Sequence, residues 1–228
     1  MHWVRASGNA SSVVGTRDNP VRASIDALAR QAGLSFIVNV VLDASGRVRA
    51  CVAGDLAAAH REGVRRARPY HEVSLPARPD IVVADACPFD IEFWQANKAV
   101  DTAGLCVRPG GQVIVVSPCY EGFSQTHAQE LLRYGYPTRA EIIRLVESGR
   151  LPHKVVGVHM LQVREVMDRA RLTLVTDGIP QADVERTGLA WAPSPQAALD
   201  RALAETGNGA RVAILRGAAE MLPVLPAN

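Results

Sequence analysis

The sequence predicts an α/β protein with a Rossmann-like parallel sheet and flanking helices, preceded by a partial α+β segment. Past a proline-flanked stretch at residues 75–79, short β-rich runs alternate with helical segments. Such alternation is typical of parallel strands joined by crossover helices. Before that stretch, one hairpin signal stands between two helical segments. We therefore predict two domains, at residues 1–76 and 77–228.

The composition is that of an ordinary globular protein. Of 228 residues, 48% are hydrophobic and 21% are charged, which excludes disordered, collagen-like and coiled-coil chains. The 25 basic and 23 acidic residues leave a formal net charge of +2, which favours neither nucleic acid nor a membrane as a partner. Lys98 and Lys154 are the two lysines, so a lysine in a site is easily recognised.

The cysteines and the apolar runs indicate the compartment. Four cysteines form no C-x-x-C pair and are expected to be reduced thiols. They are Cys51, Cys87, Cys106 and Cys119. No signal peptide is visible, and the apolar runs are far shorter than the ~20 residues of a membrane-spanning helix. We therefore expect a cytoplasmic protein.

The elements of the first domain are predicted from caps and turns. They are a helix at 21–31, strands at 34–42 and 47–52, and a helix at 56–68. Asn19-Pro20 opens the first helix, and the four turn residues 43–46 join the strands as a hairpin. Asp55 caps the second helix, which Pro69 is expected to end. One hairpin and two helices make a thin core, so this segment is expected to be incomplete.

The second domain shows the strand and helix alternation. Its predicted strands are 80–85, 112–117, 172–176 and 212–215, and its predicted helices are 90–107, 138–147, 159–170 and 194–206. Thr138 and Glu141 form a capping box that opens one of these helices.

The first strand end of the predicted sheet offers a candidate site, because ligands of open parallel sheets gather at the carboxyl ends of strands. The following helix carries Gln95 and Lys98, whose spacing of three puts them on one face. An amide beside a cation can hold a carboxylate or polarise a carbonyl, which suits a small organic acid. The alternative is that Lys98 pairs with Asp101 on a solvated surface and Gln95 is incidental.

The next strand end is expected to lie beside the first, so Ser117 and Glu121 can line the same crevice. Cys119 is better explained as a packing residue than as a nucleophile, because no helix N-terminus or basic partner is assured. The glycines at 108–111 and 207–209 mark turns, and the sequence contains neither G-x-G-x-x-G nor G-K-[ST].

The six histidines show no H-x-x-x-H or H-E-x-x-H spacing, so each taken singly is expected to be structural. His153 and His159 flank a strand-like Val155-Val156, and either can face the crevice. The residues alone thus predict a crevice with Gln95 and Lys98 and no visible reaction.

Several stretches follow one another in a recognisable order. They are Asp18–Arg22, Phe36–Leu42, Ala53–Gly63, Asp80–Val83, Pro88–Ile91, Trp94–Ala99 and Arg108–Gly111. Together they resemble the nickel-dependent lactate racemase family. The resemblance covers nearly the whole chain and is to roughly the second half of a family member.

The resemblance implies racemisation or epimerisation of a small 2-hydroxy acid by hydride transfer to a nickel-pincer nucleotide. In the family this cofactor is tethered through a thioamide to a lysine, its metal is also held by a histidine, and two further histidines act as bases. Gln95 and Lys98 match the family's substrate-side Gln-x-x-Lys, so both are expected to bind substrate. His2 stands at about the family's distance before Asn19-Pro20 and is the candidate nickel ligand.

The chain also departs from the family pattern. The Asp-Asp-x-Thr-Arg-Pro segment, the catalytic histidines and the tethering lysine are absent, so no catalytic residue is assigned. We expect residues 1–76 to be the remainder of the amino-terminal cofactor domain, with a separate chain as a candidate partner that supplies the missing half. Ala86-Cys87 replaces a frequent Gly-Gly, and no aromatic residue stands near Val158-His159, so the substrate need not be lactate.

Two other functions stay open at this point. One is a non-catalytic module that binds a 2-hydroxy or 2-keto acid in the crevice of Gln95 and Lys98. The other is a truncated gene product that exposes apolar surface where a missing domain packed.

Overall fold

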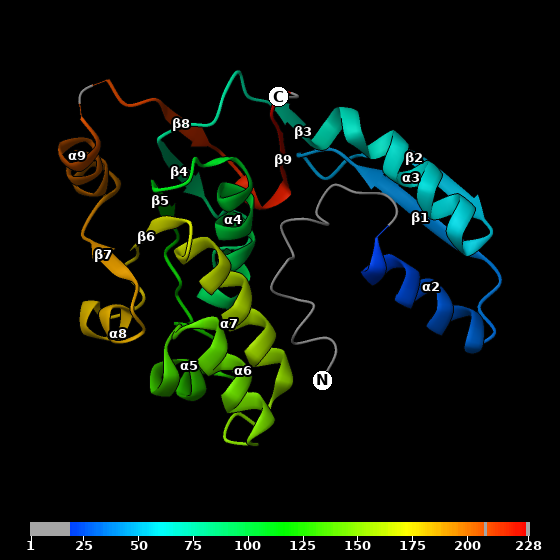
Figure 1. Cartoon of the computed structure of the whole chain (residues 1–228). Coiled ribbons are helices and arrows are strands. Elements are labelled where there is room, and N and C mark those ends of the chain that lie inside the picture. Colours follow the sequence, from blue (N-terminus) through cyan, green and yellow to red (C-terminus); the bar gives the residue numbers. More distant parts are fainter. Residues whose placement is uncertain (1–18, 208, 227–228) are drawn as a thin grey trace. The chain divides into compact units, whose positions relative to one another are not determined.

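The computed structural model describes residues 19–207 and 209–226 (Figure 1). These residues belong to two compact units that divide between Ser74 and Leu75. Within the described ranges, no helix is both long and apolar enough to cross a membrane.

The unit before Leu75 is a hairpin covered by a helix. Its elements are α2 (Pro20–Gln31), β1 (Ile37–Leu42), β2 (Val48–Gly54), α3 (Leu56–His71) and β3 (Glu72–Ser74). β1 and β2 pair antiparallel, which confirms the predicted hairpin. Val41, Val52 and Leu56 are 5%, 6% and 2% exposed, whereas Val38 and Val40 are 63% and 53% exposed. Because strand side chains alternate between faces, the described residues cover only one face of this hairpin.

Pro69 does not end α3, so that prediction was wrong. The helix continues to His71, and the N–H of Glu72 still donates to the carbonyl of Arg68. A proline removes one N–H donor, and in the last turn of a helix few later hydrogen bonds depend on it. An ion pair of 2.8 Å between Arg68 and Glu72 spans the proline.

The unit from Leu75 onward is built on a five-stranded parallel sheet. Its strands are β4 (Ile81–Asp85), β5 (Gly111–Val116), β6 (Ala170–Val175), β7 (Ala190–Ala192) and β8 (Val212–Leu215). Their order is β7-β6-β5-β4-β8, and every neighbouring pair is parallel. The predicted Rossmann-like sheet is confirmed, with β7 as a strand that the sequence pattern did not reveal.

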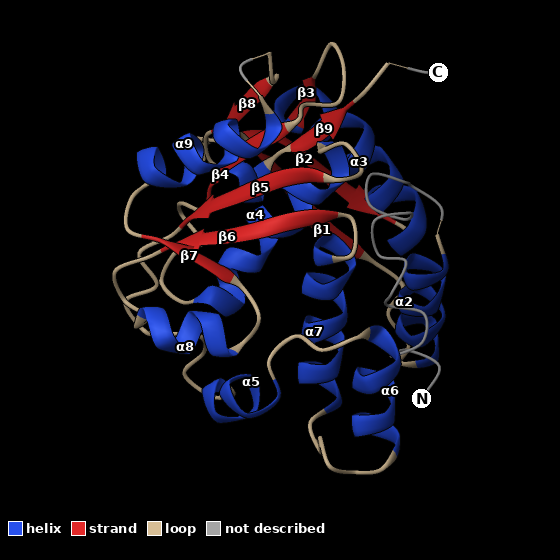
Figure 2. Ribbon diagram, turned by 60° about the vertical axis from the view of Figure 1, so that its left-hand side comes forward, coloured by secondary structure: helices blue, strands red, loops and turns tan. Residues whose placement is uncertain are grey.

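Helices cover both faces of this sheet (Figure 2). They are α4 (Phe93–Cys106), α5 (Ala128–Tyr134), α6 (Arg139–Glu147), α7 (Lys154–Met167), α8 (Gln181–Arg186), α9 (Pro195–Thr206) and the 3₁₀ turn η2 (Ala218–Glu220), with a short strand β9 (Leu222–Val224). α4 and α7 share the larger core on one face of the sheet. On the other face of the sheet, α9 packs against Ile81 and Ile114. Since parallel crossovers are right-handed, the return from β7 to β8 puts α9 on the opposite face.

The predicted boundaries differ most at α7. The sequence suggested a strand-like Val155-Val156 before a helix at 159–170, but both valines lie in the first turn of α7. Val155 is 54% exposed and Val156 is fully buried. A two-residue apolar run fits the start of an amphipathic helix as well as a strand, and here the helix is formed. The predicted capping box of Thr138 and Glu141 is confirmed at the start of α6.

α4 packs closely on α7 at one glycine. A Cβ atom added to Gly104 would lie 2.6 Å from Cγ2 of Val166, which is 6% exposed. Near this contact, the negative charge of Glu165 on α7 acts on the half-buried carboxyl group of Asp101 on α4. Burial, and secondly the charge of Glu165, raise the pKa of Asp101 to about 7.

The substitution Gly104→Ala is expected to destabilise the protein by about 1–2 kcal/mol, because the stiff, buried Val166 cannot move aside freely. Alanine gains about 1 kcal/mol of helix propensity over glycine, so a net loss means that the clash outweighs the gain. Urea denaturation followed by circular dichroism measures the change. Gly209→Ala is the control, since nothing lies within 4 Å of a Cβ atom there; equal midpoints for both variants would contradict the packing argument.

The substitution Asp101→Asn is expected to stabilise the protein above pH 7 and to have little effect near pH 4. An aspartate in the unfolded chain releases its proton near pH 4, whereas folded Asp101 keeps it until about pH 7. Wild-type stability therefore falls as pH rises through this window, by about 2–4 kcal/mol, and the amide removes that loss. Denaturation midpoints at several pH values test this, with the exposed Asp200→Asn as control. A pH-independent difference would refute it.

Candidate substrate-binding site

Gln95 and Lys98 lie together on α4, close to the loop that follows β4. Nζ of Lys98 donates a hydrogen bond of 2.6 Å to Oε1 of Gln95. The same ammonium lies 3.7 Å from the centroid of the Phe89 ring, a cation–π contact from the loop itself. Burial lowers the pKa of Lys98 from its ordinary value. The pair therefore places a cation and an amide side by side on one helix face.

The backbone N–H groups at the start of α4 are already used. The N–H of Phe93 donates to the carbonyl of Gly122 at 2.9 Å. The N–H of Trp94 donates to the carbonyl of Phe123 at 2.9 Å, and the next two N–H groups donate to the carbonyl of Glu92. Free N–H groups at a helix start commonly hold anions, but here the loop after β5 occupies them. An acid bound at this face has to be held by side chains.

The alternative ion pair between Lys98 and Asp101 is not formed in the described part of the chain. The hydrogen bond of Lys98 goes to Gln95 instead. Asp101 has a pKa raised by burial and secondly by the charge of Glu165 on α7. Neighbouring turns of one helix thus present the cation and the carboxylate to different surroundings.

At the next strand end, the prediction that Ser117 lines a crevice was wrong. Ser117 is 1% exposed, and its hydroxyl donates to the carbonyl of Asp90 at 3.2 Å. Glu121 is exposed. Cys119 is fully buried, its thiol donates to the hydroxyl of Ser117 at 3.2 Å, and burial raises its pKa. A buried thiol with a raised pKa is a poor nucleophile, which supports the packing interpretation.

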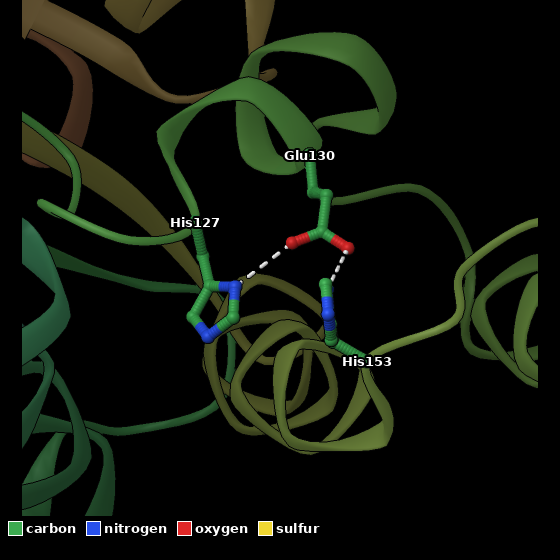
Figure 3. Close-up of side chains that lie close together, drawn as sticks. All are labelled: His127, Glu130 and His153. Atoms are coloured by element: carbon green, nitrogen blue, oxygen red, sulfur yellow. Dashed lines mark hydrogen bonds and ion pairs between the residues drawn. The ribbon is translucent and has the colours of Figure 1, made fainter.

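Three side chains that the sequence did not bring together meet between α5 and α7 (Figure 3). Nδ1 of His127 lies 2.9 Å from Oε2 of Glu130, and Nδ1 of His153 lies 2.8 Å from Oε1 of the same carboxylate. Burial alone would raise the pKa of Glu130, but the hydrogen bonds from His153 and His127 outweigh it and the pKa is lowered. These three residues are called the His–Glu–His cluster below.

The predictions made for His159 and His2 have different outcomes. His159 is 3% exposed, is stacked on Trp94 with ring centroids 4.3 Å apart, and makes a hydrogen bond of 3.1 Å with the hydroxyl of Tyr136. Burial, and secondly His127, lower the pKa of His159 to about 3, so it is a neutral core histidine. His2, the candidate nickel ligand, lies outside the described residues.

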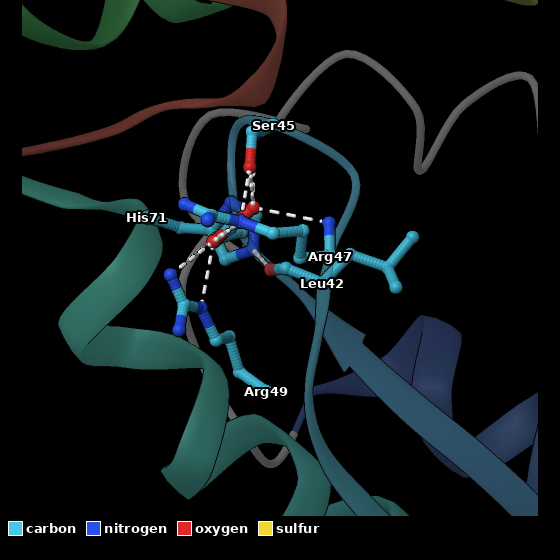
Figure 4. A network of polar contacts seen from close by, with 6 residues as sticks. Leu42, Ser45, Arg47, Arg49 and His71 are labelled. Atoms are coloured by element: carbon cyan, nitrogen blue, oxygen red, sulfur yellow. Dashed lines mark hydrogen bonds and ion pairs between the residues drawn. The ribbon is translucent and has the colours of Figure 1, made fainter.

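The polar network at the turn between β1 and β2 is local and structural (Figure 4). The carboxylate of Asp43 accepts hydrogen bonds from the hydroxyl of Ser45 at 2.6 Å, the N–H of Arg47 at 3.1 Å and the guanidinium of Arg49 at 2.6 Å. The bond from Ser45 is the largest of several that hold the pKa of Asp43 well below its usual range. An Asx turn of this kind closes a hairpin and needs no ligand.

A family comparison identifies the second unit. The family model for the lactate racemase C-terminal domain matches residues 75–222. The lactate racemase of Thermoanaerobacterium thermosaccharolyticum is 30% identical over 108 residues, which are 46% of this chain and 25% of that protein. The lactate racemase of Lactiplantibacillus plantarum is 33% identical over 107 residues, again 46% of this chain and 25% of that protein. Each alignment covers a quarter of the relative's length.

Solved structures share the fold. The lactate racemase apoprotein from T. thermosaccharolyticum superposes with a TM-score of 0.72 and 20% identity, covering 86% of this chain and 47% of that one. A protein from Thermotoga maritima superposes with a TM-score of 0.68 and 17% identity, covering 92% and 54%. The chain thus spans about half the length of these structures, and at such identities the likeness concerns the fold alone.

The family match extends over well more than half of the chain. It includes all five strands of the parallel sheet together with Gln95 and Lys98. The resemblance inferred from the ordered stretches is confirmed. The chain belongs to the lactate racemase family, and residues 75–222 are its lactate racemase C-terminal domain.

Proposed function

We propose that this lactate racemase-like protein racemises or epimerises a small 2-hydroxy acid, and that Gln95 and Lys98 bind that acid. The observation that carries the proposal is the hydrogen bond of 2.6 Å that couples Lys98 to Gln95 on the helix after β4. The two relatives above are named lactate racemase, and lactate is a 2-hydroxy acid.

The chemistry of the pair suits the two ends of such an acid. An ammonium carries three donors, and the oxygen of Gln95 takes one of them and orients the rest. The remaining donors of Lys98 can hold the carboxylate, a charge-assisted interaction. The amide nitrogen of Gln95 can donate to the hydroxyl or keto oxygen at the neighbouring carbon. In this proposal both residues bind and orient the substrate, and neither moves the proton.

The nickel-pincer nucleotide that the resemblance implies would supply a hydride acceptor. The residues of the described ranges do not fit its attachment. Of the two lysines, Lys98 is coupled to Gln95 beside Phe89, and Lys154 is exposed at the start of α7. We therefore assign no step through this group to residues 19–226. We propose that the cofactor is held elsewhere in the assembled enzyme, with His2 as a nickel ligand.

The lactate racemase relatives contain sequence that this chain does not match. We propose that an equivalent segment, in the same chain or in a separate one, supplies the rest of the active site. Residues 1–76 would then be the remainder of the cofactor domain and residues 77–228 the substrate-side domain. The uncovered hairpin face supports this, because Phe36, Val38, Val40 and Val48 are 53–63% exposed. Apolar faces of this kind are typically covered by another element.

The substitution Lys98→Ala is expected to weaken binding of lactate or another 2-hydroxy acid about 30- to 150-fold, because a charge-assisted contact of about 2–3 kcal/mol is lost. Isothermal titration calorimetry with D-lactate, L-lactate and a panel of 2-hydroxy acids measures it. Lys154→Ala is the matched control, since it removes the other lysine from an exposed position.

The same variant separates the racemase from a binding module. In the nickel-loaded assembled enzyme, Lys98→Ala should reduce racemisation, followed by chiral chromatography, by a similar factor or more. Near-normal turnover by the variant would refute the role of Lys98. Saturable binding by wild-type protein with no racemisation in the assembled enzyme would favour the non-catalytic module instead.

The substitution Gln95→Glu is expected to weaken binding more than Gln95→Ala does. Its carboxylate would pair with the ammonium of Lys98 and repel the carboxylate of the acid, whereas alanine only removes donors. We expect about a 100-fold loss for the glutamate variant and about a 10-fold loss for the alanine variant. Calorimetry at low salt compares the two, and a glutamate variant that binds as well as wild type would exclude this geometry.

A further inference from the structure

We propose that the His–Glu–His cluster binds a divalent transition-metal ion of the zinc class. One ligand atom from each of His127, Glu130 and His153 lies within 4.8 Å of those of the other two. The carboxylate stands between the two imidazole rings, with one oxygen directed to each (Figure 3). The argument for this site is independent of the proposed function.

The backbone holds the three positions in place. His127 is the N-cap residue of α5, and Glu130 lies in the first turn, so their spacing of three puts them on one edge of the helix. His153 is the N-cap residue of α7. Leu131 directly follows Glu130 in the chain, and Val156 lies three residues after His153. Both are fully buried and anchor the two helix starts. The ligands therefore come from two packed elements and not from free loops.

The donor set suits zinc. Two imidazole nitrogens and one carboxylate oxygen are the ligands of many zinc sites, and three protein ligands leave the fourth position to water or another small ligand. In tetrahedral zinc coordination, bonds of about 2.0–2.1 Å set the ligand atoms roughly 3.4 Å apart. From separations of up to 4.8 Å, small side-chain rotations reach that arrangement.

The surroundings orient one ligand and leave another accessible. The Trp94 ring lies against His127, with centroids 5.2 Å apart, and is itself stacked on the buried His159. His127 and Glu130 have 15% and 19% of their side-chain surface exposed, whereas His153 has 60%. Two ligands are thus held in partly buried positions, and an ion can enter from the solvent side of His153. Contacts that fix ring orientation support metal affinity.

The test uses protein freed of metal by chelator dialysis and titrated with zinc chloride in a calorimeter. We expect one equivalent to bind to wild type, and Glu130→Gln and His153→Ala each to weaken binding at least about 100-fold. His153 is 60% exposed, so its alanine variant should fold, which circular dichroism checks. Zinc should also raise the melting temperature of wild type, because a ligand of the folded state stabilises it, but not that of His153→Ala.

Controls separate this cluster from other histidines. His71→Ala, outside the cluster, should leave the zinc affinity unchanged. Cobalt chloride adds a spectroscopic measurement, since a tetrahedral cobalt site absorbs visible light and the absorption should vanish in His153→Ala. Absence of zinc binding by folded wild type, or wild-type affinity in both Glu130→Gln and His153→Ala, would overturn the proposal. So would loss of binding in His71→Ala alone.

Discussion

The contact on which the candidate site depends is the junction between the start of α4 and the loop after β5. The N–H groups of Phe93 and Trp94 donate to loop carbonyls, and the rings of Phe93 and Phe123 meet edge to face with centroids 5.8 Å apart. Because this junction ties the carboxyl ends of two neighbouring strands together, it sets where the helix begins. The start of the helix in turn decides which surface Gln95 and Lys98 present.

This junction has a chemical consequence. With the first N–H groups of α4 occupied, the helix start cannot serve as an anion site, and recognition of an acid passes to the side chains of Gln95 and Lys98. The same turn directs Trp94 onto His127 and His159, where its ring helps to orient one member of the His–Glu–His cluster. One backbone arrangement therefore supports both the proposed substrate site and the proposed metal site.

Features encoded over a few residues could be predicted from the sequence, and features made by distant contacts could not. The pairing of Gln95 with Lys98 is local to one helix, so spacing was enough. The burial of Ser117 depends on the carbonyl of Asp90, which lies 27 residues earlier. Likewise, His127 and Glu130 show a readable His-x-x-Glu spacing, but His153 joins them only through packing of α5 against α7.

Inversion at a carbon atom places a geometric demand on substrate binding in the proposed enzyme. Because the hydride would return from the same cofactor that took it, the planar keto acid formed midway must turn its other face toward that cofactor before the hydride returns. Side chains that hold the carboxylate by its edge and leave the carbonyl carbon uncovered allow the keto group to turn about the bond to the carboxylate. Gln95 and Lys98, coupled to each other on one helix face, are suited to such an edge-on grip. The groups that exchange the hydride and the proton with the acid must then approach from outside this helix, which is why the C-terminal domain binds the acid in this proposal but does not by itself transform it.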